Sequence, residues 1–167
     1  LSIRLGNGDG TFGAVANYGT GTGPFSLAAG DLDSDGDLDL VTGDNIGSFS
    51  VLLGNGNGTF QSASTISTGD TFSVALGDVN GDGKLDVALA LLSTDEVSVL
   101  HGNGDGTFQA ANNFGTGTRP DYVAIVDLNG DGSLDLATAN AFGNSVSILL
   151  GNGNGTFQTA SNLGTGA

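Results

Sequence analysis

The chain of 167 residues carries 18 acidic and only 3 basic residues, which gives a formal net charge of −15. Because nucleic-acid binding needs clustered cations and the basic residues here are scattered, the composition excludes DNA and RNA as partners. Cys is absent, so disulfides cannot stabilise the fold, and no apolar run approaches the roughly 20 residues of a membrane span. We therefore expect no membrane insertion.

Short apolar runs, separated by Gly-rich turns, predict β-strands along the whole chain. None of them has the 3.6-residue apolar spacing of a helix over a sufficient length, so we expect almost no helix. In the first complete repeat the runs cover residues 25–32, 38–42, 49–53 and 60–66. The corresponding runs cover residues 72–79, 85–91, 97–101 and 108–114 in the second repeat, and 122–128, 134–139, 146–150 and 157–163 in the third.

One acidic nonapeptide, Asp-x-[Asp/Asn]-x-Asp-Gly-x-x-Asp, occurs three times, at residues 31–39, 78–86 and 127–135. It holds 11 of the 18 acidic residues, so the negative charge is local. So many carboxylates in nine residues repel one another unless a cation lies between them, and Ca²⁺ prefers such oxygen ligands. Gly at position six allows the sharp turn around an ion. The pattern therefore predicts three calcium sites.

The expected ligands are the side chains at positions one, three, five and nine and the backbone carbonyl at position seven, with the last Asp binding through both oxygens. An EF-hand is excluded because it needs flanking helices and a Glu at position twelve, and an unliganded Asp-Gly turn remains the alternative. The predicted ligands are Asp31, Asp33, Asp35, Asp37 and Asp39 in the first loop, Asp78, Asn80, Asp82, Lys84 and Asp86 in the second, and Asp127, Asn129, Asp131, Ser133 and Asp135 in the third.

A second motif, Gly-Asn-Gly-[Asp/Asn]-Gly-Thr-Phe, begins at residues 6, 54, 102 and 151, with spacings of 48, 48 and 49 residues. Two motifs with one period indicate tandem structural units, and this period is typical of a propeller blade. Asp9 and Asp105 in this motif are exchanged for Asn57 and Asn154 elsewhere, so we interpret it as a turn rather than a second ligand site. In an antiparallel meander, the acidic loops and these turns lie at one end of the blades.

On these motifs the chain resembles the FG-GAP or VCBS repeats of integrin-α-like β-propellers, although the Phe-Gly signature survives only as Phe12-Gly13. The resemblance implies an all-β fold of four-stranded antiparallel blades, with calcium in the hairpin loops. About three and a half blades of an expected seven-bladed ring are present.

We expect a single propeller segment over residues 1–167. It divides into a half blade at 1–23 and three blades at 24–71, 72–119 and 120–167. Two copies would supply enough strands for seven blades, but each leaves an unpaired half blade that the other cannot complete. A fragment of a larger propeller is therefore favoured, and exposed blade edges invite further blades or self-association.

The expected function is a non-catalytic module for binding or adhesion, outside the cell or at its surface, with structural calcium. Catalysis is not expected, because the chain has one His, no Cys and no acid–base pair free of the acidic loops. The ligand, a carbohydrate or a protein, is expected on the variable connections at the opposite end. Arg119 and Tyr122 lie near one of these connections, and a packing role is favoured for both over contact with the ligand. The alternative function is a scaffold or accessory segment of a larger secreted enzyme or surface protein.

Overall fold

The computed structural model describes residues 1–166, and these residues form β-strands and turns without a helix. No helix in the described part is therefore long and apolar enough to cross a membrane. The last residue of the expected third blade, Ala167, lies outside the described residues. The strands are β1 (Ser2–Ile3), β2 (Ala16–Asn17), β3 (Pro24–Gly30), β4 (Asp39–Asp44), β5 (Ser48–Leu52), β6 (Ser64–Ser67), β7 (Thr71–Gly77), β8 (Asp86–Leu91), β9 (Glu96–Leu100), β10 (Asn112–Gly115), β11 (Pro120–Val126), β12 (Asp135–Asn140), β13 (Ser145–Leu149) and β14 (Ser161–Gly164).

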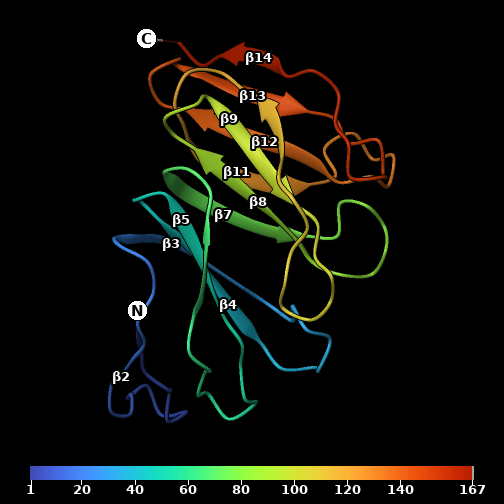
Figure 1. Cartoon of the computed structure of the whole chain (residues 1–167). Helices are drawn as coiled ribbons and strands as arrows, with labels where there is room; N and C mark the ends of the chain where they lie inside the picture. Colours follow the sequence, from blue (N-terminus) through green and yellow to red (C-terminus); the bar gives the residue numbers. More distant parts are fainter. Residues whose placement is uncertain (167) are drawn as a thin grey trace.

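Consecutive strands pair in antiparallel fashion to build the sheets. Three sheets have four strands each, β3-β4-β5-β6, β7-β8-β9-β10 and β11-β12-β13-β14, and β1 pairs only with β2. The sheets follow one another in space as they do in the sequence, from β2 at one end of the molecule to β14 at the other (Figure 1). The prediction of all-β, four-stranded antiparallel blades is confirmed, and the described residues do not close into a ring.

The fourth strand of each blade starts later than the apolar pattern predicted. In the first complete blade Phe60 forms only an isolated bridge to Gly54, and β6 begins at Ser64. Phe60 is the last residue of the Gly-Asn-Gly motif, which closes its own turn, with the Asn55 N–H donating to the Thr59 carbonyl at 3.0 Å. These backbone groups are therefore satisfied within the turn and are not available to a strand ladder.

The hydrophobic core lies between neighbouring blades. One cluster, which includes Phe49, Val87 and Leu89, joins the first two complete blades, and a second, which includes Val97 and Leu136, joins the second to the third. Every residue of β8 is buried because its sheet is covered on both faces. Burying large apolar side chains stabilises the fold by about 1.5–3 kcal/mol each, so the contacts between neighbouring blades hold the repeats together.

The first strands of the blades, β3, β7 and β11, pack against each other in that order. The Val74 N–H of β7 donates to the Ser26 Oγ of β3 at 3.1 Å, and the Val123 N–H of β11 donates to the Ser73 Oγ of β7 at 3.2 Å. The same bond therefore recurs at both interfaces, and it fixes how far one blade slides along the next.

Candidate metal loops

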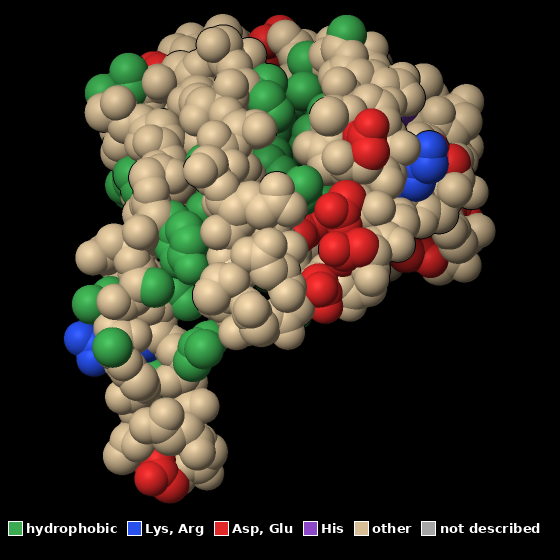
Figure 2. Space-filling view, turned by 60° about the horizontal axis from the view of Figure 1, so that its bottom comes forward, with side chains coloured by type: hydrophobic (Ala, Val, Ile, Leu, Met, Phe, Trp, Pro, Cys, Tyr) green, Lys and Arg blue, Asp and Glu red, His purple; other side chains and the backbone are tan. Residues whose placement is uncertain are grey.

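The three acidic nonapeptides form the connections β3–β4, β7–β8 and β11–β12, and the Gly-Asn-Gly turns connect β5–β6, β9–β10 and β13–β14. Because the sheets are antiparallel meanders, both kinds of connection lie at the same end of each blade. Figure 2 turns this end toward the viewer and shows acidic side chains grouped in patches on its surface. The two sequence motifs thus meet at one face of the molecule.

In the first loop, three carboxylates converge. Oxygens of Asp31, Asp33 and Asp39 all lie within 4.8 Å of one another. The Asp31 Oδ1 is buried and accepts no hydrogen bond, whereas its Oδ2 accepts one from the Gly36 N–H at 3.1 Å. A buried carboxylate oxygen without a partner is costly, and a hard divalent cation would satisfy it. The residues present therefore fit Ca²⁺.

The electrostatics of the first loop also favour a cation. Burial raises the pKa of Asp33, and the neighbouring charges of Asp39, Asp35 and Asp31 raise it further. Backbone N–H groups oppose this only in part, since the Asp33 Oδ1 accepts a single bond from the Asp35 N–H at 3.3 Å. The loop thus concentrates negative charge that its own hydrogen bonds do not balance.

In the second loop, the side-chain oxygens bind the backbone of the loop itself. The Asp78 Oδ1 accepts from the Gly81 N–H at 2.7 Å, and its Oδ2 accepts from the Gly83 N–H at 2.8 Å. The Asn80 Oδ1 accepts from the Asp82 N–H at 2.9 Å, and the Asp82 Oδ1 from the Lys84 N–H at 2.9 Å. The oxygens at positions one, three and five therefore face their own turn.

The third loop repeats this arrangement. The Asp127 Oδ1 and Oδ2 accept from the Gly130 and Gly132 N–H groups at 2.7 and 3.0 Å. Backbone donation from Ser133 and side-chain donation from Asn129 lower the pKa of Asp131. Among the described residues only the first loop gathers three acidic side chains around one point. The ligand assignments in all three loops remain predictions.

The last Asp of each nonapeptide is buried and joins the two motifs. Its Oδ1 and Oδ2 each accept one backbone N–H, which leaves further lone pairs for a metal. The Oδ2 bonds are Leu32 to Asp39 (2.7 Å), Val79 to Asp86 (3.0 Å) and Leu128 to Asp135 (2.9 Å). The Oδ1 bonds are Gly54 to Asp39 (2.7 Å), Gly102 to Asp86 (2.9 Å) and Gly151 to Asp135 (2.7 Å).

The bond between the last Asp of each nonapeptide and the Gly-Asn-Gly turn was not predicted, although the sequence contains a signal for it. The first Gly of the turn motif follows the last Asp of the nonapeptide by 15 or 16 residues in every blade. That Gly must lack a side chain, because a Cβ on Gly54 would lie 2.3 Å from the Leu38 carbonyl oxygen. Burial raises the pKa of Asp86, and the Gly102 and Val79 N–H groups act in the opposite direction.

The fourth residue of the Gly-Asn-Gly motif stabilises its own turn. The Asp9 Oδ1 accepts from the N–H and the hydroxyl of Thr11 at 2.9 and 2.6 Å, and these bonds lower the pKa of Asp9. The Asn57 Oδ1 accepts the same two bonds from Thr59 at 3.0 and 2.7 Å. A carboxylate and an amide are therefore equivalent here, as a turn role requires.

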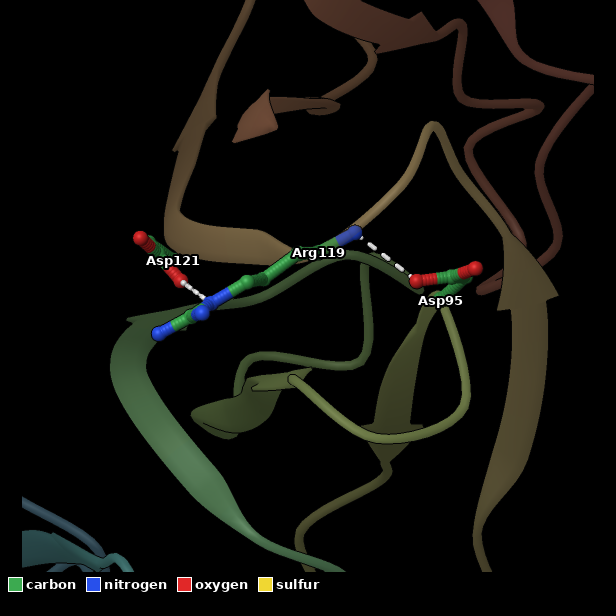
Figure 3. A network of polar contacts seen from close by, with 3 residues as sticks. All are labelled: Asp95, Arg119 and Asp121. Atoms are coloured by element: carbon green, nitrogen blue, oxygen red, sulfur yellow. Dashed lines mark hydrogen bonds and ion pairs between the residues drawn. The ribbon is translucent and has the colours of Figure 1, made fainter. Parts of the chain in front are cut away.

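At the opposite end of the blades, Arg119 is held by several groups (Figure 3). Its backbone N–H donates to the Asp95 Oδ1 at 2.7 Å, and its Nε lies 3.3 Å from the Asp121 Oδ1. The guanidinium carbon lies 4.1 Å from the centre of the Phe142 ring, which is itself exposed. Arg119 thus packs between two blades, while Phe142 and Tyr122 remain open to solvent.

A lectin from Agrocybe aegerita, whose structure is described as the basis of its recognition of non-reducing terminal N-acetylglucosamine, has a similar fold. The TM-score is 0.62 at 24% sequence identity, over 98% of this chain and 46% of the lectin. The chain therefore spans about half the length of that lectin. The sequence matches no curated protein.

The FG-GAP-like repeat family matches the sequence three times, over residues 1–42, 31–89 and 78–138. Successive matches overlap at the acidic nonapeptides of residues 31–39 and 78–86, so the repeat in the sequence coincides with the repeat of loops and sheets. The chain belongs to the FG-GAP-like repeat family.

Proposed function

We propose that the chain is a calcium-stabilised, non-catalytic module that binds carbohydrate outside the cell or at its surface. The observation that carries the calcium part is the buried, unpartnered Asp31 Oδ1 beside the oxygens of Asp33 and Asp39. Hydrogen bonds of the loop do not compensate this charge, and an oxygen-coordinating dication would do so.

The first loop would hold the ion through Asp31, Asp33, Asp35 and Asp39, with the backbone carbonyl of Asp37. When bound, Ca²⁺ supplies positive charge that balances the carboxylates and fixes the loop. The chain itself contributes the buried Asp39, which already connects this loop to the Gly-Asn-Gly turn. The second and third loops would bind through the corresponding residues.

The carbohydrate part rests on the fold that the chain shares with the lectin from Agrocybe aegerita and on the opposite end of the blades. There Phe142, in the turn between β12 and β13, and Tyr122, near the start of β11, are exposed, and Asp121 precedes Tyr122 in β11. Aromatic faces and carboxylates are groups that contact sugar rings and hydroxyls. Because ligand binding would use this end and calcium the other, calcium would act on ligand affinity only through blade stability.

Isothermal titration with CaCl₂ tests the calcium part. We expect three sites in the wild-type chain and two after Asp31→Ala. Asp9→Asn is the matched control, because it also removes a carboxylate but lies where other repeats carry Asn, and it should leave all three sites. Absence of calcium uptake by the wild-type chain would contradict the proposal.

A glycan array that includes N-acetylglucosamine-terminated glycans, probed at saturating CaCl₂, tests the carbohydrate part. We expect binding that Phe142→Ala weakens and that Asp9→Asn does not change. Binding to no glycan would remove the carbohydrate assignment and leave the calcium assignment intact.

A further inference from the structure

Arg119 has a backbone conformation that another blade assigns to Gly. Its φ is 59°, and Gly23, at the same place before the first strand of the first complete blade, has φ = 70°. The carbonyls of the two residues accept the same bond, from the Ala141 N–H at 2.9 Å and from the Asn45 N–H at 3.0 Å. The fold therefore uses a left-handed residue here but needs no side chain, and Arg in this conformation is strained. Strained residues of this kind cluster at ligand sites.

The carboxylate of Asp95 holds this strained backbone in place. Its Oδ1 accepts the Arg119 N–H at 2.7 Å, and its backbone carbonyl accepts the N–H and the hydroxyl of Thr116, both at 2.9 Å. At the preceding interface the Gly47 carbonyl accepts the equivalent Thr68 N–H at 3.0 Å, but Gly47 has no side chain that could bind further along the connection. The side-chain bond to Arg119 therefore distinguishes the connection between the second and third blades.

The side chain of Arg119 is fixed at two points, and its terminal donors stay open (Figure 3). Its Nε donates to the Asp121 Oδ1 at 3.3 Å, and its guanidinium carbon lies 4.1 Å from the centre of the Phe142 ring. Within residues 1–166, the two terminal nitrogens of the guanidinium have no acceptor and the Asp121 Oδ2 has no donor. Because Phe142 is 71% exposed, its ring buries little of Arg119, so packing alone does not explain why Arg stands where Gly suffices.

The charge around Arg119 is negative despite its own guanidinium. Arg119 is the only Lys or Arg at this end of the blades, since Lys84 lies in the second acidic loop and Arg4 lies two residues before the first Gly-Asn-Gly motif. A carboxylate or sulfate on a ligand would therefore meet more negative than positive charge, whereas an uncharged ligand would not be repelled. The acidic residues that are wholly or partly open to solvent at this end are Asp70, Asp95, Glu96 and Asp121.

We propose that Arg119 contacts the ligand directly and restricts it to uncharged sugars, an inference that rests on the carbohydrate function proposed above. The terminal nitrogens of Arg119 donate to one hydroxyl of the sugar, and the Asp121 Oδ2 accepts from a neighbouring hydroxyl. Phe142 supports the guanidinium, and Asp121 cancels its charge. The site therefore recognises hydroxyls and discriminates against carboxylate and sulfate groups.

Arg119→Gly tests the contact with the ligand, because Gly already occupies this place in the first complete blade. On a glycan array at saturating CaCl₂, we expect binding to neutral glycans to weaken by about tenfold or more, since hydrogen bonds from a charged group are lost. The unfolding temperature should change by less than about 3 °C, because relief of the strain offsets the lost contacts with Asp121 and Phe142. Loss of binding without loss of stability distinguishes contact with the ligand from packing.

Asp121→Asn tests the selection against acidic ligands. The array carries each neutral terminal sugar beside the corresponding uronic acid, which differs only by a carboxylate at C6. We expect the original chain to prefer the neutral sugar and Asp121→Asn to reduce this preference by about threefold or more, because the guanidinium charge is no longer cancelled. Asp70→Asn is the matched control. It removes a carboxylate at the same end, where the Asp70 carbonyl accepts the Leu92 N–H as the Arg119 carbonyl accepts that of Ala141, and it should leave the preference unchanged.

Binding of the original chain to no glycan would overturn this proposal together with the carbohydrate function. Glycan binding that Arg119→Gly leaves unchanged would overturn this proposal alone, and so would equal or stronger binding of the uronic acids by the original chain. If Arg119→Gly lowers both glycan binding and the unfolding temperature, the preference measured for Asp121→Asn decides. A preference equal to that of Asp70→Asn would then assign Arg119 to packing and overturn the proposal.

Discussion

The first acidic loop differs from the second and third in how its oxygens are used. In residues 31–39 the oxygens of Asp31, Asp33 and Asp39 converge and one of them is unpartnered. In residues 78–86 and 127–135 the Oδ1 of the first Asp instead accepts the N–H of the Gly at position four. The other backbone bonds to the side chains at positions one, three and five are present in all three loops. One nine-residue pattern therefore supports two arrangements.

Sequence differences within the pattern account for this contrast. The first loop has Asp33 where the others have Asn80 and Asn129, and Ser34 where the others have Gly81 and Gly130. Asn can donate to a neighbouring carboxylate, as Asn129 does to Asp131 at 2.8 Å, whereas Asp only adds repulsion. A loop with five carboxylates therefore depends on a cation more than a loop with three does.

Replacing the last Asp of a loop, which all three loops share, should have the largest effect and lower the free energy of unfolding. Asp39→Ala and Asp86→Ala each leave two buried N–H donors without an acceptor, at about 1–3 kcal/mol per donor. We expect both variants to lose about 2–6 kcal/mol of unfolding free energy, in chelator as well as in calcium. Urea denaturation measures this loss. A neutral result in chelator would show that these residues act only through the metal.

The charge difference at position three of the loops should have the next largest effect, a change in calcium affinity. Asp33→Asn makes the first loop resemble the others, and we expect its calcium affinity to fall about tenfold, because ligand charge tunes such sites. Asn129→Asp is the reciprocal variant and should strengthen the third site. Isothermal titration of both variants measures the change. Equal affinities before and after exchange would break the comparison between the loops.

The difference in backbone strain at position four of the loops should have a smaller effect on stability. Ser34 has φ = 63°, and Gly130 in the third loop has φ = 76°. Because a side chain is strained in this conformation, Ser34→Gly should stabilise the protein by about 0.5–1 kcal/mol. Gly130→Ser should destabilise it by a similar amount. Thermal unfolding in chelator compares the two, and a change of the same sign in both would contradict the comparison.

The pH dependence in chelator should show the smallest effect, with opposite signs in the two loops. The pKa of Asp33 is raised, so its carboxyl favours folding at acidic pH, and this contribution is lost as pH rises from 3.8 through the folded pKa. The pKa of Asp131 is lowered, so its contribution is present above pH 3.8 and is lost as pH falls through the folded pKa.

Unfolding measured at several pH values between about 3 and 7 tests these signs. Asp33→Asn should stabilise the chelated protein toward pH 7, and Asp131→Asn should destabilise it there. If the stability of the two variants changed with pH in the same direction, the loops would carry equivalent charges.

The sequence by itself determined the strands, the period and the location of the acidic loops. These features are local, since strand patterns, turn residues and loop carboxylates lie within about ten residues of one another. For the same reason the prediction overextended the fourth strand at Phe60, where the turn motif and the apolar pattern share residues.

Only the tertiary structure decided how the repeats fit together. The bond from Gly54 to Asp39 and the packing of Leu85 on Gly30 join residues 15 and 55 positions apart. Their geometry depends on how one sheet lies against another, which is set by burial of the interblade core rather than by any nearby sequence. The same packing leaves Leu38 exposed on the first blade, although its counterpart Leu85 is partly buried against the neighbouring blade.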